Sequence, residues 1–402
     1  MNLFTVNVFS IPLGQPLSFS LRNENGVLLA RKGHMFFQRG VLHKLAGHGT
    51  LWVDMREVNA YQEAIAKQNT GKRDERNSTG TNETSKANAQ AGKPKESAID
   101  RDSLAVDWLG LQSSANALLR HPQTPDFQKR LNLLQHELTR LVRRSPDATL
   151  LALIHLAAEE DRLYSATHAL FVGAVCSLAA LEVLDWSEEL ASTLISAALT
   201  MNISITELQD QLAIQSEPLS DEQKSQIDSH AQRSVHLLKG LGISDPVWLE
   251  AISNHHKSNS GALKSKSPTE QIARLIHRAD VFAARLSPRS SRPSMASLAA
   301  MKSAYFDEEQ RVDDAGASII KALGIHHPGA LVTLASGDTA VVVRRGLNGL
   351  NPMVAVLVNR QGMPLAEPVL RDTSQPEYGI VANINHNSIK VRSDLLRLLA
   401  VA

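Results

Sequence analysis

HALFVGAVCSLAALEVL, residues 168–184, is an apolar run with a single charged residue, and it sets the fold class of its part of the chain. The run falls short of the ~20 apolar residues that a helix needs to cross a bilayer, so it predicts a buried core helix and no membrane insertion. Cys176 within it is the only cysteine of the chain, which excludes a disulfide framework and a cysteine-based zinc site. We expect Cys176 to be a small buried hydrophobe and the compartment to be a reducing cytoplasm.

Helical patterns extend on both sides of this run, from residue 102 to residue 326. FQKRLNLLQHELTRLVRR, residues 127–144, predicts an amphipathic helix with leucines at helical spacing: Leu131, Leu134, Leu138 and Leu141. Ser220 is a predicted N-cap, and Gln223 completes a capping-box pattern with it. The segment 102–326 therefore predicts a central all-α domain.

Segments with short alternating patterns flank the helical domain and make the chain multidomain. Residues 1–65 predict a small α+β domain, with a β-hairpin around NENG (23–26), a helix at 37–49 and a strand at 50–55. Residues 66–101 have almost no apolar side chains and predict a disordered polar linker. Residues 327–402 predict a small β-rich domain, with two strands around Ser336-Gly337-Asp338, a third in PMVAVLVNRQGMPL and a closing helix in SDLLRLLA.

The overall composition is that of a globular protein. Hydrophobic residues make up 43% of the 402 residues and charged residues 21%, with a formal net charge of +1. This balance gives no attraction to nucleic acid or to a membrane surface. The first residues, MNLFTVNVFSIPLG, lack the basic start and long apolar stretch of a signal peptide, which agrees with a cytoplasmic protein.

Histidines and one aspartate recur in the helical domain at positions where they could form a metal site. They lie on, or at the ends of, predicted helices: His168, His230, His255, His256 and Asp280. Imidazoles and a carboxylate converging from several helices could bind one or two divalent metals. Each also has an ordinary explanation. A core histidine can hydrogen-bond to backbone, a His-His pair suits a helix C-terminus, and Asp280 could cap a helix or pair with Arg278 or Arg285.

The order of these motifs resembles the HD-GYP subfamily of HD-domain phosphohydrolases over roughly residues 160–326. The resemblance implies a helical bundle that holds a metal cluster and hydrolyses the bacterial second messenger cyclic di-GMP. It matches His168 to the family's first helix histidine and His230 to the histidine after a PLT-type cap. His255 and His256 match its HH pair, and Asp280 matches the aspartate of ADVF. SPRSSR, residues 287–292, falls on the family's TSDRPYR, which makes Arg289 and Arg292 candidate phosphate contacts.

Departures from the family pattern fall on its catalytic centre. The family's HDIGK falls on Met201, Asn202, Ile203, Ser204 and Ile205, so the His-Asp pair and the lysine are absent. Lys257 stands where a glutamate is usual, and no GYP follows the HH pair. Neutral Asn202 offers only one carbonyl oxygen, and the soft thioether of Met201 is poorly matched to iron, manganese or magnesium. Without a bridging carboxylate a multi-metal cluster keeps too much positive charge, and no hydroxide is generated to attack phosphorus.

Five arginines in the second half of the helical domain allow two interpretations. Arg274, Arg278, Arg285, Arg289 and Arg292 lie at helix-compatible offsets. They could form one basic stripe that holds phosphate oxygens, or a solvated charged face. Pro288 argues against one unbroken helix.

These observations predict a catalytically degenerate HD-GYP-like protein that acts in bacterial second-messenger signalling as a regulator or a scaffold. It would bind cyclic di-GMP, another nucleotide or a protein partner, with no catalytic residue and no bound metal. The expected residual pocket comprises His168, Met201, Asn202, His230, His255, His256 and Asp280. The alternative is an active, metal-dependent cyclic di-GMP phosphodiesterase with a reduced site, in which His168, His230, His255, His256 and Asp280 hold iron or manganese.

Overall fold

The computed structural model describes residues 3–6, 11, 17–23, 26–32, 34, 51–54, 57, 101–159, 163–257, 261–346, 349–388 and 393–402. The chain divides into two compact units, Met1–Glu96 and Ser97–Ala402. The helix expected at 37–49 lies outside the described residues. So does all of the expected linker except Arg101, which begins the first helix of the second unit.

The first unit contains a four-stranded antiparallel sheet. In chain order its strands are β1 (Leu3–Val6), β2 (Leu21–Arg22), β3 (Leu28–Ala30) and β4 (Leu51–Asp54), and their order in the sheet is β1-β4-β2-β3. The hairpin expected around NENG joins β2 to β3. Its turn is closed by the Asn23 side chain, which accepts a hydrogen bond from Val27 N at 2.9 Å, and by Gly26 at φ 78°. The hairpin and the strand expected at 50–55 are therefore confirmed.

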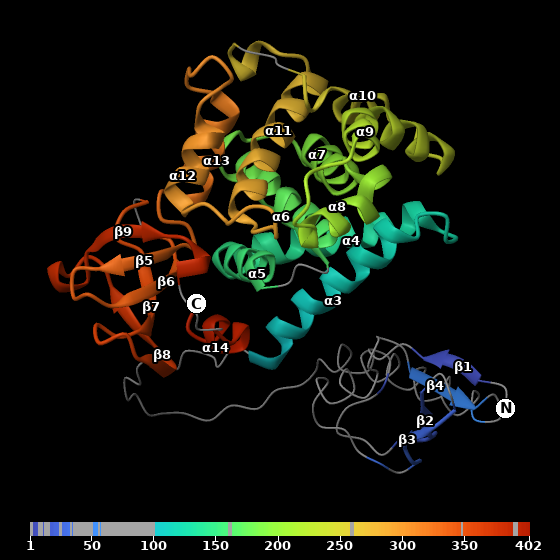
Figure 1. Cartoon of the computed structure of the whole chain (residues 1–402). Helices are drawn as coiled ribbons and strands as arrows, with labels where there is room; N and C mark the ends of the chain where they lie inside the picture. Colours follow the sequence, from blue (N-terminus) through green and yellow to red (C-terminus); the bar gives the residue numbers. More distant parts are fainter. Residues whose placement is uncertain are drawn as a thin grey trace, which may run out of the picture. The chain divides into compact units, whose positions relative to one another are not determined.

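The second unit is mainly helical (Figure 1). Its α-helices, in chain order, are α3 (Arg101–Arg120), α4 (Phe127–Arg144), α5 (Pro146–Glu159), α6 (Tyr164–Leu178), α7 (Glu188–Thr200), α8 (Thr206–Ile214), α9 (Asp221–Gly240), α10 (Pro246–Asn254), α11 (Pro268–Leu286), α12 (Ser297–Tyr305), α13 (Asp314–Leu323) and α14 (Leu395–Leu399). Shorter segments are η4 (Ala179–Val183), η5 (Ile203–Ile205), η6 (Leu263–Ser265), η7 (Pro376–Tyr378) and η8 (His386–Ser388). The predicted capping box is present at α9, where the Ser220 side chain accepts from Gln223 N and the Gln223 side chain accepts from Ser220 N.

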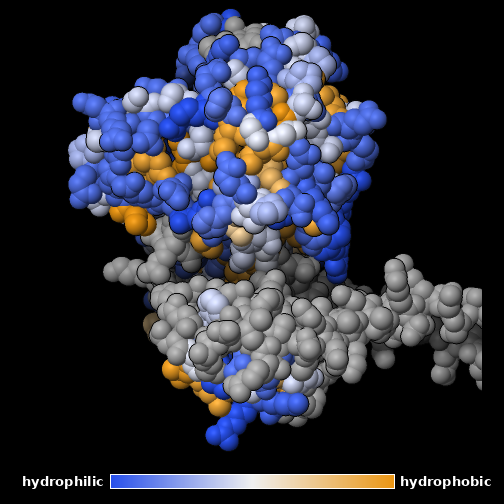
Figure 2. All heavy atoms as spheres, turned by 90° about the vertical axis from the view of Figure 1, so that its right-hand side faces the viewer, coloured by the Kyte–Doolittle hydropathy of each residue, from blue (hydrophilic) through white to orange (hydrophobic). Residues whose placement is uncertain are grey.

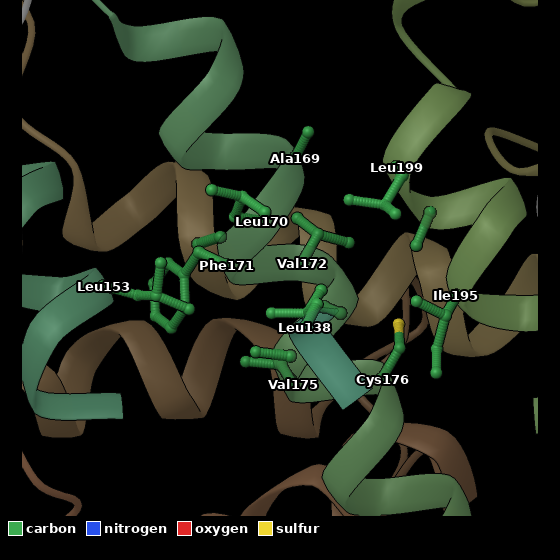
Figure 3. Close-up of a cluster of buried hydrophobic side chains, with 14 of the residues drawn as sticks. Leu138, Leu153, Ala169, Leu170, Phe171, Val172, Val175, Cys176, Ile195 and Leu199 are labelled. Atoms are coloured by element: carbon green, nitrogen blue, oxygen red, sulfur yellow. The ribbon is translucent and has the colours of Figure 1, made fainter. Parts of the chain in front are cut away.

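Helix α6 forms the centre of the helical part, and every one of its 15 residues is buried. Apolar side chains of α4, α5 and α7 surround it (Figure 3). All four leucines predicted on the inner face of α4 are buried. Gly173 lets α4 approach α6, because a Cβ there would meet the Leu138 side chain at 3.0 Å.

The length of this apolar segment corrects one expectation from the sequence. Tyr164–Val183 covers 20 residues with a mean hydropathy of 1.6, which is long and apolar enough to cross a membrane. The estimate that it falls short of that length is therefore wrong. Within the structure, however, 83% of the segment is buried inside the unit, as expected for a core helix.

A five-stranded antiparallel sheet follows the helices (Figure 1). Its strands are β5 (Leu331–Leu334), β6 (Thr339–Arg344), β7 (Met353–Val358), β8 (Pro364–Asp372) and β9 (Ile380–Ile384), in the order β8-β7-β6-β5-β9. The strands predicted around Ser336-Gly337-Asp338, the third strand and the closing helix α14 are all present.

This sheet belongs to the same compact unit as the helices. Leu331, Val341 and Leu357 join the helical core, whereas their neighbours Val332 and Val342 lie in a second small core on the other face. The boundary expected at residue 327 is thus a change of secondary structure within one unit.

The surface of the helical part is mostly polar. Figure 2 shows the face that lies on the right in Figure 1, where apolar side chains gather in its middle and polar side chains surround them. Scattered and grouped apolar residues of this kind are common on protein surfaces.

Candidate functional site

A buried hydrogen bond joins His168 of α6 to Asp280 of α11. The imidazole Nε2–H donates to Asp280 Oδ1 at 2.7 Å, and the His168 side chain is only 3% exposed. Burial raises the pKa of the Asp280 carboxyl, but the hydrogen bond from His168 and the nearby histidines lower it more. The net effect holds this pKa well below its usual range, so Asp280 is a carboxylate at neutral pH.

The Tyr164 ring covers the outer face of this pair. Tyr164 begins α6, one turn before His168, and its ring stacks on the imidazole with centroids 5.6 Å apart and planes at 9°. Its hydroxyl accepts a hydrogen bond from Arg289 Nη2 at 2.7 Å, and the Arg289 guanidinium lies 4.7 Å from the ring centroid. Tyr164 therefore connects an arginine to the histidine–aspartate pair.

Met201 and Asn202, which the sequence resemblance aligns with a His-Asp pair, lie beside His168. They follow α7 and precede η5, with Met201 1% exposed and packed into the helical core. A cavity of about 10 Å³ is lined by His168, Met201, Asn202 and Ser165, among others. That volume is close to the minimum for a single water molecule, so this part of the site is closed to a larger group. Ile205, at the family's lysine position, packs with Leu208 and Leu212.

Three histidines converge in the other half of the site. His230 comes from α9, and His255 and His256 follow α10. His230 Nε2 lies 3.3 Å from His255 Nε2 and 3.2 Å from His256 Nε2. His230 and His255 are buried, whereas His256 is exposed. Burial lowers the pKa of His255 to about 3, and burial also lowers the pKa of His256, so both rings are neutral at pH 7.

The hydrogen bonds of the two buried rings fix which nitrogen carries the proton. His230 Nδ1 lies 2.5 Å from the Ile227 carbonyl oxygen, and His255 Nδ1 lies 2.6 Å from the Ile252 carbonyl oxygen. Because a carbonyl can only accept, each Nδ1 carries the hydrogen and each Nε2 presents a lone pair. Two facing lone pairs repel each other unless a cation or a proton lies between them.

This donor set fits a single divalent metal ion. The three ligand atoms lie within 4.8 Å of one another, and two of the rings are oriented by backbone carbonyls, as metal-binding histidines usually are. Imidazole ligands suit zinc, copper, iron or nickel, whereas manganese and magnesium prefer carboxylate and carbonyl oxygens. A bound ion of this kind would act as a Lewis acid at the exposed His256 side. The sequence predicted no bound metal, whereas the structure contains a histidine cluster that could hold one ion.

The structure separates the five arginines that the sequence placed at helical offsets. α11 ends at Leu286, so Arg289 and Arg292 lie beyond it in a short hairpin, joined by paired backbone hydrogen bonds. Arg274 and Arg278 are buried and form ion pairs with Glu308 and Asp313. The idea of one continuous basic stripe is thus wrong, and a solvated face is wrong for Arg274 and Arg278.

Three further residues of this region escaped the sequence reasoning. Tyr164 lies four positions before His168, a spacing that places both on one helix face and could have been noticed. His277 lies three positions before Asp280, and its ring centroid is 6.0 Å from that of His256. Glu308 Oε1 lies 3.3 Å from His277 Nε2. Because Glu308 is far from His277 along the chain, no sequence spacing pointed to this contact.

Comparisons with known proteins support the fold. No family profile and no curated protein sequence matches the chain. Among solved structures the chain is similar to Bd1817, an HDG"Y"P protein from Bdellovibrio bacteriovorus, with a TM-score of 0.52 and 13% sequence identity. The similarity covers 79% of this chain and 98% of Bd1817. At this identity the likeness concerns the fold, and the chain has an HD-GYP-like fold.

Proposed function

We propose that this protein is a catalytically degenerate HD-GYP-like regulator or scaffold in bacterial second-messenger signalling. It binds a nucleotide such as cyclic di-GMP, or a protein partner, and does not hydrolyse the nucleotide. Support comes chiefly from the direct 2.7 Å contact between His168 and Asp280. These two side chains match metal-binding positions of the family, and here they satisfy each other.

The surroundings of that contact support the same conclusion. Met201 fills the position of a family ligand, and the remaining cavity of about 10 Å³ leaves no room for a second metal with its coordinated water. Phosphodiester hydrolysis by two metals requires ions about 3.5–4 Å apart that hold both the attacking and the leaving oxygen. The three-histidine half alone supplies one ion at most.

The arginine hairpin is the candidate anion contact of this regulator. Arg289 holds its place through the Tyr164 ring and hydroxyl, and Arg292 donates to the Ala284 carbonyl oxygen. Burial lowers the pKa of Arg292, and the like charges of Arg289 and Arg285 lower it further. Such mutual repulsion between guanidinium groups is relieved when a phosphate binds between them.

An active phosphodiesterase is the second candidate, and the three-histidine cluster favours it. His230, His255 and His256 could hold one ion that activates a water molecule, with Asp280 nearby as a carboxylate. In that case the reaction would need no second metal.

Hydrolysis and metal content measured on the same preparation test the proposal. We expect no conversion of cyclic di-GMP to a linear dinucleotide above background, with or without added manganese, iron or zinc.

Arg289→Ala should weaken cyclic di-GMP binding by about 1–3 kcal/mol, the scale of a charge-assisted hydrogen bond. Metal-dependent product that disappears in His255→Ala would instead establish the enzyme. If the wild-type protein binds no nucleotide, the scaffold form of the proposal remains.

A further inference from the structure

A cleft of about 510 Å³ lies between α11, α12 and the turn after α12. Its α11 wall contains His277, Arg278, Val281 and Arg285, and its opposite wall contains Lys302, Ser303, Phe306, Asp307, Glu308 and Gln310. This volume is within the range of about 300–1,000 Å³ that is typical of small-molecule sites. His277 connects the cleft to the three-histidine cluster through its edge contact with His256.

The two acidic residues of the cleft are already engaged. Glu308 forms ion pairs with Arg274 at 3.1 Å and with Arg278 at 2.6 Å, and it also contacts His277. Asp307 accepts backbone hydrogen bonds from Glu309 N at 2.9 Å and from Arg311 N at 2.8 Å. Both carboxylates therefore have partners of their own, and one of these partners, Arg278, also lines the cleft.

Two cations of the cleft remain without an acidic partner. Among the residues that the structure describes, no carboxylate forms an ion pair with the side chains of Arg285 or Lys302. Arg285 belongs to α11 and Lys302 to α12, so their charges lie on opposite walls. Arg285 also adds to the positive potential that lowers the pKa of Arg292. The cleft thus has two cations without an ion pair, beside an apolar part formed by Val281 and Phe306.

A polar group without a partner lies at the end of the cleft nearest to the histidines. His277 Nδ1 is buried and makes no hydrogen bond within the described structure. Because this nitrogen has almost no accessible surface, it is not a ligand contact in this structure. The cleft therefore offers two cations and an aromatic wall.

We propose that this cleft binds a nucleoside monophosphate, with Arg285 and Lys302 holding the phosphate and Phe306 providing an apolar wall for the base. Phosphate is favoured over a carboxylate because two cations on opposite walls can share its three terminal oxygens. An aromatic side chain suits any nucleobase, because every base has a flat face for stacking. Arg285 also acts on Arg292 of the neighbouring hairpin, but this site goes beyond the proposed function because Lys302 and Phe306 form its other wall.

Calorimetric titration of the full chain with guanosine 5′-monophosphate tests the site, with guanosine as the uncharged comparison. We expect guanosine monophosphate to bind and guanosine to bind at least about tenfold more weakly, the effect of one lost charge-assisted contact. The double variant Arg285→Ala/Lys302→Ala should lose at least about tenfold in affinity for the nucleotide. The matched control Lys239→Ala/Lys321→Ala removes two exposed positive charges from α9 and α13 and should bind like wild type.

Several outcomes would overturn the site. These are equal affinity for guanosine and its monophosphate, wild-type affinity in Arg285→Ala/Lys302→Ala, or no binding at millimolar nucleotide. Thermal unfolding of each variant verifies the fold, and we expect little change in Tm because both side chains border solvent. A cyclic di-GMP titration of Lys302→Ala keeps the two proposals apart, because this variant leaves Arg289, Arg292 and the charge of Arg285 intact.

Discussion

Met201 and Asn202 change what the site can hold because of their charge and shape. A thioether at 201 packs into the core with 1% of its surface exposed, whereas a histidine there would bring two polar nitrogens into the same space. Asn202 is half-buried and neutral, beside a cavity that His168 also lines. Met201 and Asn202 therefore pack against their neighbours without needing a metal ion, because neither side chain carries a charge.

Asn202→Asp should destabilise the metal-free protein by about 1–3 kcal/mol, because a carboxylate in this half-buried turn loses hydration without gaining a cation. Urea unfolding at pH 7.5 in the presence of a chelator measures the change. Asn132→Asp on the exposed face of α4 is the matched control and should stay within about 0.5 kcal/mol of wild type.

Combining this change with Met201→His should raise the amount of bound divalent metal above that of the wild type. The two substitutions restore the ligand types that HD-GYP proteins carry at these positions. Equal metal content in wild type and double variant, with both folded, would show that the closed packing around His168 prevents coordination.

Helix α6 contacts several helices of the second unit, among them α4, α7 and α11. Leu138 of α4 is fully buried against Gly173 of α6, and the sequence pattern of α4 already pointed to this face. Leu133 lies on the same helix but is 63% exposed. Replacing Leu138 and Leu133 separately therefore compares the stability contributed by a packed leucine and by a solvated leucine on the same helix.

Leu138→Ala should lower the free energy of unfolding by about 2–5 kcal/mol, since it removes buried methyl groups and leaves a cavity between α4 and α6. Leu133→Ala should change it by less than about 0.5 kcal/mol. Chemical denaturation followed by circular dichroism compares the two. Similar losses for both would mean that α4 does not pack on α6 through this face.

At the scale of the second unit, the helices and the C-terminal sheet are joined by partly exposed ion pairs and by a buried histidine. Arg345, just after β6, forms ion pairs with Asp147 of α5 at 2.5 Å and with Glu182 of η4 at 3.1 Å. His327, between α13 and β5, is fully buried and contacts the Phe282 ring of α11 edge-on. Burial, with a smaller contribution from the charge of His326, lowers the pKa of His327 to about 4.

This buried histidine should make the unit sensitive to acid. Its pKa is about 4 in the folded state and about 6.5 in the unfolded chain, so below pH 6.5 only the unfolded chain takes up the proton. Stability is therefore complete above pH 6.5 and falls by up to about 1.4 kcal/mol per pH unit until pH 4. His327→Leu should lose less stability than wild type between pH 7.5 and 5.0 in urea unfolding.

The exposed His136 of α4 supplies the comparison, and His136→Gln should keep the wild-type difference between the two pH values. His155 and His386 also have their pKa lowered to about 4 by burial, so His327→Leu removes only part of the effect. An unchanged pH dependence in His327→Leu would show that other groups carry it.

The sequence by itself determined the local structure of this protein. Helical spacing identified α4, side-chain chemistry fixed the cap at Ser220, and turn residues gave the hairpins at NENG and Ser336-Gly337-Asp338. These features depend on interactions between residues a few positions apart, so a short stretch contains all the information. The sequence also supplied the identity of the candidate site residues, but through resemblance and without distances.

Only the tertiary structure decided which of those residues meet. His168 and Asp280 are 112 positions apart, and their contact depends on α6 and α11 packing side by side. In the sequence, Arg274 and Arg278 were as suited to a phosphate as the later arginines. In the structure, the turn after α12 brings Glu308 close to both, and it forms an ion pair with each of them. Helical spacing fixes the face on which a side chain lies, whereas the segment that covers this face is chosen by the packing of the whole core.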